Sequence, residues 1–271
     1  MLKAYFLIAI SGLSVLPVAL SAEEQTATWV NTYGLSGGLI DMPTAEVGPD
    51  GRLITTISHF GGTTKTNLSF QLTPRISGVF RYSGIKGLTA PGSGLSTYFD
   101  RSFDVHYQIF DEKQYRPALA VGLRDFLGTG LYSGEYVVAT KSVGPKLRLT
   151  GGLGWGRLGS HGSFAVMGSR PTQTLGSGGI PNYDRWFRGP VAGFAGINYN
   201  HNDRLGFSVE YSSDAYVRED RRIFDVKSPF NFGAKYKFND TVQLGASYMY
   251  GSEFGSGSFS GRSISTFFSW L

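Results

Sequence analysis

Histidine and serine are the residue types in this 271-residue chain with the most obvious catalytic potential. The four histidines are His59, His106, His161 and His201, and no two of them have the spacing of a metal-binding pair. His161 and Ser163 could supply a general base and a nucleophile, but no third residue at a fixed spacing is evident to orient the histidine. The chain has no cysteine. We therefore predict a protein that is not an enzyme, with no catalytic residue, no metal site and no cofactor.

A second group of residues could bind a ligand rather than transform it. Residues 184–188 read DRWFR, so aromatic rings stand beside two cations. Such a cluster can stack on sugar rings and contact anionic groups. An ordinary anchor near a membrane interface is the alternative for the same residues. We keep Asp184, Arg185, Trp186 and Arg188 as candidate polysaccharide contacts.

These residues are positioned by segments whose side chains alternate with a period of two. In residues 205–212 the odd positions hold Leu, Phe, Val and Tyr, and the even positions hold Gly, Ser, Glu and Ser. This alternation predicts β-strands with one apolar face. Twelve segments are expected to be strands: 52–60, 67–72, 76–85, 102–110, 117–125, 135–142, 147–156, 190–199, 205–213, 230–238, 241–251 and 262–271.

The composition agrees with a β-protein and excludes several other classes. Glycine accounts for 38 residues, about twice the ordinary usage of ~7 %. Glycine disfavours a helical bundle, and the 41 % hydrophobic content disfavours disorder. The net charge of +5 is scattered and forms no basic run, so no nucleic-acid partner is expected.

The connections between the expected strands indicate the architecture. Residues 73–75, 111–116, 143–146, 200–204 and 239–240 are short, whereas most alternate connections are longer and rich in glycine and serine. Short turns at one end and long loops at the other are typical of a bacterial outer-membrane barrel. We predict an all-β fold: a transmembrane antiparallel up-and-down β-barrel of about 12 strands, with short periplasmic turns and long extracellular loops. A soluble periplasmic β-protein is the alternative.

The N-terminus predicts export from the cytoplasm. Residues 1–22 have a positive start at Lys3, an apolar stretch and small residues for cleavage, which is the pattern of a signal peptide. We expect residues 23–51 to form a periplasmic N-terminal segment and residues 52–271 to form the barrel. The expected location is the outer membrane of a Gram-negative bacterium. The expected partners are outer-membrane lipid and the barrel-assembly machinery that inserts such proteins.

Five stretches of sequence resemble the YjbH family of outer-membrane proteins: GLIDMPTAE at 38–46, RPALAVGL at 116–123, DFLGTGLYSGEYVVATK at 125–141, GLGWGRLG at 152–159 and EYSSDAY at 210–216. The chain is similar to the N-terminal part of the longer family members. The resemblance implies a non-enzymatic role in exopolysaccharide or capsule biosynthesis, export or assembly, with a polysaccharide and other export proteins as partners. It also implies that Asp41, Thr44 and Glu46, in the first stretch, plug the lumen or dock a periplasmic partner. A lipid-modifying hydrolase of the outer membrane is the alternative function.

Inward-facing charges are the remaining candidates. At the inward positions of the alternation we expect ten polar side chains to line the lumen and contact polysaccharide. A barrel of twelve strands is narrow enough for such charges to close it. These residues are Arg81, Asp104, His106, Arg124, Glu135, Lys141, Arg148, Glu210, Lys235 and Lys237.

Overall fold

The computed structural model describes residues 29–86, 96–172, 179–181, 183–216, 224–253 and 262–270. The predicted signal peptide, residues 1–22, lies outside them. The described part is built from strands and two short 3-10 helices, η1 (Gly156–Gly159) and η2 (Tyr183–Arg185). The strands are β1 (Leu53–Phe60), β2 (Thr63–Thr73), β3 (Ile76–Lys86), β4 (Thr97–Phe110), β5 (Ala118–Arg124), β6 (Gly134–Val143), β7 (Leu147–Gly154), β8 (Ser163–Met167), β9 (Gly189–Asn200), β10 (Leu205–Tyr211), β11 (Phe224–Lys237), β12 (Val242–Glu253) and β13 (Arg262–Trp270).

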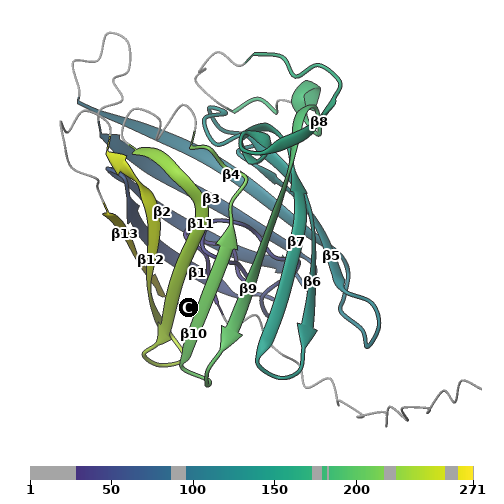
Figure 1. Cartoon of the computed structure of the whole chain (residues 1–271), viewed down its shortest axis with the longest axis vertical. Coiled ribbons are helices and arrows are strands. Elements are labelled where there is room, and N and C mark those ends of the chain that lie inside the picture. The colour runs from purple at the N-terminus through teal and green to yellow at the C-terminus, as the bar shows by residue number, and fades with distance from the viewer. Residues whose placement is uncertain are drawn as a thin grey trace, which may run out of the picture.

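Twelve of these strands form a ring of antiparallel pairs (Figure 1). Each strand pairs with its neighbours along the chain, β7 pairs with β9, and β9 pairs with β10. The ring is completed because β1 pairs with both β2 and β13. The predicted antiparallel β-barrel of about twelve strands is confirmed.

Strand β8 is the element that the period-two pattern did not predict. It lies in the long connection between β7 and β9 and pairs only with the outer end of β9. All five of its residues are exposed, so neither face is buried. A strand with no buried face has no alternation of apolar and polar residues for the sequence to show.

Several strands are longer than the sequence predicts. Strand β2 begins at Thr63 rather than at residue 67, because Gly61 and Gly62, with φ of 55° and 74°, close a two-residue turn. Strand β4 begins at Thr97 and β11 begins at Phe224. The positions added to β2, residues 63–66, hold polar side chains that the apolar alternation did not mark.

The two faces of each strand differ in burial as the alternation predicts. In β10, Phe207 and Val209 point away from the ring and are 44 % and 40 % exposed, whereas Ser208 and Glu210 are buried. The outward set is apolar on neighbouring strands as well. No helix in the described ranges is long and apolar enough to cross a membrane.

Residues 29–48, which we call the lumen segment, lie inside the ring of strands. Residues 29–45 are all buried, and their bonds reach inward side chains of strands on opposite sides of the ring, such as Arg124 of β5 and Gln243 of β12. The segment folds back on itself through two bridges, Val30 to Ser36 and Gly38 to Pro43. The sequence predicts a periplasmic segment ahead of the barrel at residues 23–51. Of these, residues 29–48 fill the inside of the barrel in the structure.

Candidate functional site

The centre of the lumen is organised around one carboxylate, that of Glu210 on β10. Its Oε2 accepts the three consecutive backbone N–H groups of residues 40–42, at 2.8–2.9 Å. Its Oε1 accepts a bond from the Asn231 side-chain amide at 2.9 Å. Glu210 is fully buried. Hydrogen bonds to an ionised acceptor are the stronger kind, so this contact fixes the lumen segment at mid-barrel.

Two cations of the wall bind backbone carbonyl oxygens close to that contact. Lys235 on β11 donates through Nζ to the carbonyls of Gly38 and Leu39. Arg124 on β5 donates to the carbonyl of Asp41. The backbone of the lumen segment is therefore held by an acceptor and by donors, each from a different strand.

Glycines on three adjacent strands form sockets for apolar side chains of the lumen segment. A Cβ placed on Gly206 would lie 2.6 Å from the Trp29 ring, and one on Gly196 would lie 2.4 Å from Leu39. A Cβ on Gly233 would lie 3.0 Å from Ile40. A side chain at Gly206 or Gly196 would force Trp29 or Leu39 to shift, and one at Gly233 would press tightly on Ile40, so the inward glycines of β9, β10 and β11 make room for the lumen segment.

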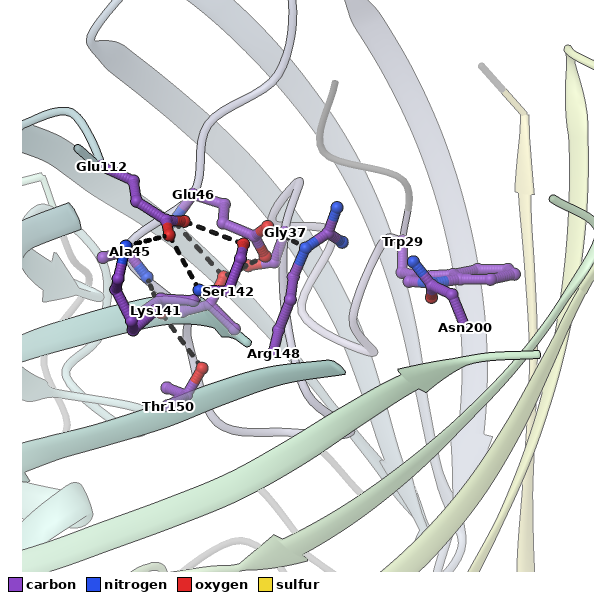
Figure 2. A network of polar contacts seen from close by, with 12 residues as sticks. Trp29, Gly37, Ala45, Glu46, Glu112, Lys141, Ser142, Arg148, Thr150 and Asn200 are labelled. Carbon is purple, nitrogen blue, oxygen red and sulfur yellow. Dashed lines mark hydrogen bonds and ion pairs between the residues drawn. The ribbon is translucent and has the colours of Figure 1, made fainter. Parts of the chain in front are cut away.

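Both ends of the lumen segment contact wall residues that are next to short turns in the chain, and Figure 2 shows the residues involved. At one end the Trp29 ring N–H donates to Asn200 at 2.6 Å. At the other end Glu46 pairs with Arg148 at 3.1 Å, and the Ala45 N–H donates to the Thr140 hydroxyl at 2.9 Å. Residues 29–48 therefore begin and end at the same end of the barrel and turn back inside the lumen.

The Tyr33 ring, in the upper part of the lumen segment, is surrounded by cations of the wall. Arg124 lies 4.0 Å from the ring centroid, Lys65 lies 4.2 Å away, and Arg81 lies 4.7 Å away. Arg81 is fully buried and makes two bonds to Asp104, at 2.9 and 2.7 Å. Buried cations over an aromatic face are stabilised by its quadrupole, so this ring helps the wall to keep its positive charges in the lumen.

The long loops cover the lumen segment at the other end of the barrel. The Tyr216 hydroxyl donates to Asp41 at 2.5 Å, and Arg157 pairs with Asp214 at 2.7 Å. Tyr216 adopts a positive φ of 50°, which is uncommon for a residue with a Cβ. Burial raises the pKa of the Tyr216 phenol, and the nearby Asp41 carboxylate raises it further. The phenol therefore stays protonated and donates to Asp41.

A second loop group with an altered pKa is Asp125, which follows β5. Burial raises the pKa of its carboxyl group well above the ordinary value, and the neighbouring Asp100 carboxylate adds to the increase. Asp125 also has a positive φ, of 52°, and accepts the Tyr132 N–H at 2.9 Å. The loops at this end are thus tied down by local polar bonds.

Eight of the ten predicted lumen residues lie on the inward face. Lys237 is near Trp29, with Nζ 5.8 Å from the ring, and His106 Nδ1 lies 2.9 Å from the Tyr136 hydroxyl. The inward residues are Arg81, Asp104, His106, Arg124, Arg148, Glu210, Lys235 and Lys237.

The inward assignment of Glu135 and Lys141 was wrong. Alternate residues of β6, among them Tyr136 and Thr140, are buried against the lumen contents, so the odd-numbered positions belong to the opposite face. Lys141 instead pairs with Glu112 in the turn after β4, at 2.7 Å. Glu135 is covered by the long loops and pairs with Arg170 at 2.6 Å.

Residues 184–188 do not form one exposed cluster. Arg185 is buried and donates to the carbonyl of Pro171 at 3.0 Å, and Trp186 is half-buried. Asp184 and Arg188 are exposed. The neighbouring Phe187 packs edge-on against Trp155, with ring centroids 5.2 Å apart.

The two residues considered for catalysis, His161 and Ser163, have different neighbours. The His161 ring lies 6.3 Å from the Tyr211 ring, and Ser163 begins the exposed strand β8. None of the hydrogen bonds among the described residues joins His161 to Ser163. Within those same residues, no group of three or more metal-ligating side chains is arranged to hold an ion.

Sequence reasoning missed the residues that fill the lumen, chiefly Trp29, Tyr33 and Leu39. The stretch at 38–46 could have indicated them, because its resemblance to the YjbH family implies that it plugs the lumen or docks a periplasmic partner. A family model named YjbH, with the description "Exopolysaccharide biosynthesis protein YbjH", matches residues 30–264. The chain belongs to the YjbH family. The match includes most of the lumen segment and β1 to β12 in full.

A relative in Escherichia coli K12, named as the uncharacterized lipoprotein YjbH, is 31 % identical over 229 residues. The alignment covers 80 % of this chain and 33 % of the relative, so the chain spans about a third of the relative's length. Among solved structures, the NanC porin matches with a TM-score of 0.43 at 11 % identity, covering 80 % of this chain and 98 % of the porin. The KdgM porin matches with a TM-score of 0.45 at 8 % identity, covering 81 % and 98 %. The COG4313 outer-membrane channel of Pseudomonas putida F1 matches with a TM-score of 0.44 at 12 % identity, covering 85 % and 99 %.

Proposed function

We propose that this chain is an outer-membrane β-barrel with a non-enzymatic part in the biosynthesis, export or assembly of an exopolysaccharide. Membership of the YjbH family supports the link to exopolysaccharide. The observation that carries the proposal is the contrast between an apolar outer wall and a polar lumen filled by the chain itself. We also propose that residues 1–22 are removed as a signal peptide, and that outer-membrane lipid, the barrel-assembly machinery and other export proteins are partners.

The apolar outer wall supports the membrane location. Large apolar side chains point outward and are exposed on many strands, with Phe232 at 51 %, Leu244 at 41 % and Phe103 at 42 %. Soluble monomers rarely expose contiguous apolar patches larger than a few hundred Å². In lipid such a surface is favourable, and strands can cross a bilayer because a closed barrel pairs all their backbone groups. Membrane fractionation with heat-modifiable gel mobility tests this location, and a protein found wholly in the soluble periplasm would contradict it.

The filled lumen supports a role that involves no chemical transformation by the barrel. The inward polar groups of Glu210, Lys235 and Arg124 are engaged with backbone atoms of the lumen segment. Their arrangement holds a peptide in place. The lipid-hydrolase alternative is tested separately by replacing His161 and Ser163 and measuring phospholipid turnover, which we expect to be unchanged.

Deletion of the gene tests the role in exopolysaccharide. We expect the amount or the composition of secreted polysaccharide to change, and complementation with the intact gene to restore it. The matched control is complementation with a His161→Ala, Ser163→Ala double variant, which we expect to restore it equally. Unchanged polysaccharide in the deletion strain would overturn the proposed role.

A further inference from the structure

The inward face of the wall carries more cations than carboxylates. Among the described strand side chains that point inward, the carboxylates are Asp100, Asp104 and Glu210. The cations are twice as many: Lys65, Arg81, Arg124, Arg148, Lys235 and Lys237. A narrow passage with walls of one predominant sign concentrates ions of the opposite sign, so this interior favours anions.

The lumen segment supplies oxygen atoms to this positive wall. Its two carboxylates belong to Asp41 and Glu46, and Glu46 pairs with Arg148. Two further cations, Arg124 and Lys235, bind its backbone carbonyls. The oxygens of the lumen segment thus accept bonds from Arg124, Arg148 and Lys235, and the carboxylates of an acidic polysaccharide could accept bonds from the same three side chains.

Neutral polar side chains of the wall complete the resemblance to a sugar-binding surface. The Asn67 amide and the Ser58 hydroxyl both donate to the carbonyl of Thr32, at 3.1 and 2.9 Å. The Gln108 amide donates to the carbonyl of Ala45 at 2.8 Å. Amides and hydroxyls both donate and accept, which suits them to sugar hydroxyl groups.

The lumen segment is attached in a way that permits withdrawal. Both of its β-bridges join residues within the segment, and no ladder of backbone pairs joins it to a described strand. Its two ends, at Trp29 and Gly48, contact Asn200 and Gln71, which stand beside short turns. The segment can therefore leave toward the short-turn end without crossing the barrel wall.

We propose that the positive lumen is a binding path for an anionic polysaccharide, and that residues 29–48 occupy this path as an internal competitor. This inference rests on the proposed function and names the class of polymer that it concerns. The closed state is the structure described above. The open state is reached when the lumen segment is displaced, which exposes the six cations together.

Ion conductance in planar bilayers tests the proposal with the full chain. The substitutions Leu39→Ser and Ile40→Ser, made together, remove the side chains that fill the sockets of Gly196 and Gly233 and leave the wall intact. Leu72→Ser is the matched control, because Leu72 is 62 % exposed on the outer face. We expect wild type and Leu72→Ser to stay closed, and the double variant to conduct with a preference for chloride over potassium.

Block of this conductance identifies the ligand class. Alginate oligosaccharides, which are polyuronates, are expected to block the open double variant at concentrations at least tenfold lower than neutral dextran of equal length. Adding Lys235→Gln and Arg148→Gln is expected to reduce both the chloride preference and the alginate block. Adding Lys113→Gln, which removes an exposed cation from a turn, is expected to change neither.

Several outcomes would overturn the proposal. They are preference for potassium, equal block by alginate and dextran, or a barrel that stays closed after the lumen segment has become accessible to protease. If the double variant leaves the segment in place, deletion of residues 29–48 provides the same measurement, and heat-modifiable mobility shows that the barrel has folded. Failure of the proposed function is distinguishable, because unchanged polysaccharide in a deletion strain does not alter ion selectivity in a bilayer.

Discussion

Two glutamates of this barrel make similar bonds in different surroundings. Glu210 is fully buried in the lumen and accepts the backbone N–H groups of residues 40–42. Its carboxylate also attracts the Lys235 ammonium group electrostatically. Glu112 accepts the Ser142 N–H at 2.9 Å and pairs with Lys141, but its side chain is 31 % exposed in a turn. Water competes for the partners of Glu112 and is excluded from those of Glu210. The comparison therefore predicts that burial, rather than the number of bonds, decides what each carboxylate contributes.

Removal of the buried carboxylate is expected to have the largest effect. Glu210→Ala leaves three buried N–H groups and the Asn231 side-chain amide without their acceptor, which costs about 3–5 kcal/mol of unfolding free energy. Guanidinium unfolding of the refolded barrel in detergent measures this loss. Glu210→Gln is the control, since it keeps one acceptor oxygen and should lose less. An alanine variant as stable as wild type would show that the lumen segment is not held by Glu210.

A steric test of the same contact surface should give the next largest effect. Gly206→Ala places a Cβ 2.6 Å from the Trp29 ring, and overpacking of this kind costs about 1–3 kcal/mol. Gly151→Ala is the matched control, because a Cβ at Gly151 meets nothing within 4 Å. The unfolding midpoints of the two variants should differ clearly. Equal midpoints would mean that Trp29 does not occupy the Gly206 socket.

The bond between the long loops and the lumen segment should contribute less. Tyr216→Phe removes the hydroxyl that donates to Asp41 and leaves the ring in place, at a cost of about 1–2 kcal/mol. Protease sensitivity of the lumen segment is expected to rise in this variant. A change in stability with no change in protease sensitivity would assign the bond to the loop alone.

The exposed carboxylate should give the smallest effect. Glu112→Gln is expected to cost about 0.5 kcal/mol, as for other surface ion pairs. Partial burial acts to raise the Glu112 pKa, but the bonds from Lys141 and Ser142 outweigh it, so the pKa lies below its ordinary value. Its contribution is therefore present at neutral pH and is lost as the pH falls below the ordinary glutamate pKa of about 4.3 and through the lowered value. Unfolding of wild type and Glu112→Gln, at neutral pH and again below the lowered Glu112 pKa, measures this contribution. A larger loss of unfolding free energy for Glu112→Gln than for Glu210→Ala would reverse the comparison.

Some strand faces could be predicted from the sequence and others could not. In β10 the apolar residues occupy only one set of alternate positions, so Glu210 was correctly placed inward. In β6 both sets contain apolar residues, since Tyr136 and Val138 alternate with Val137 and Ala139. The period of two then identifies a strand without identifying its inner face, and Lys141 was placed on the wrong side.

The candidate site was only partly predictable for a different reason. Its wall residues lie on strands with regular alternation, which is a local property of the sequence. Their partners are distant: 170 positions separate Ile40 from Glu210, and 196 separate Leu39 from Lys235. No periodicity within the lumen segment records which side chains of the wall will face it.

The sequence by itself determined twelve of the strands and their order, because side chains alternate every two residues and short turns force neighbouring strands to pair. Only the tertiary structure decided what fills the barrel. Closure of the ring brings Gly206, Glu210 and Lys235 around one space, and residues 29–48 satisfy their shape and their bonding groups together. That match depends on groups from many strands at once, so it exists only after the ring has formed.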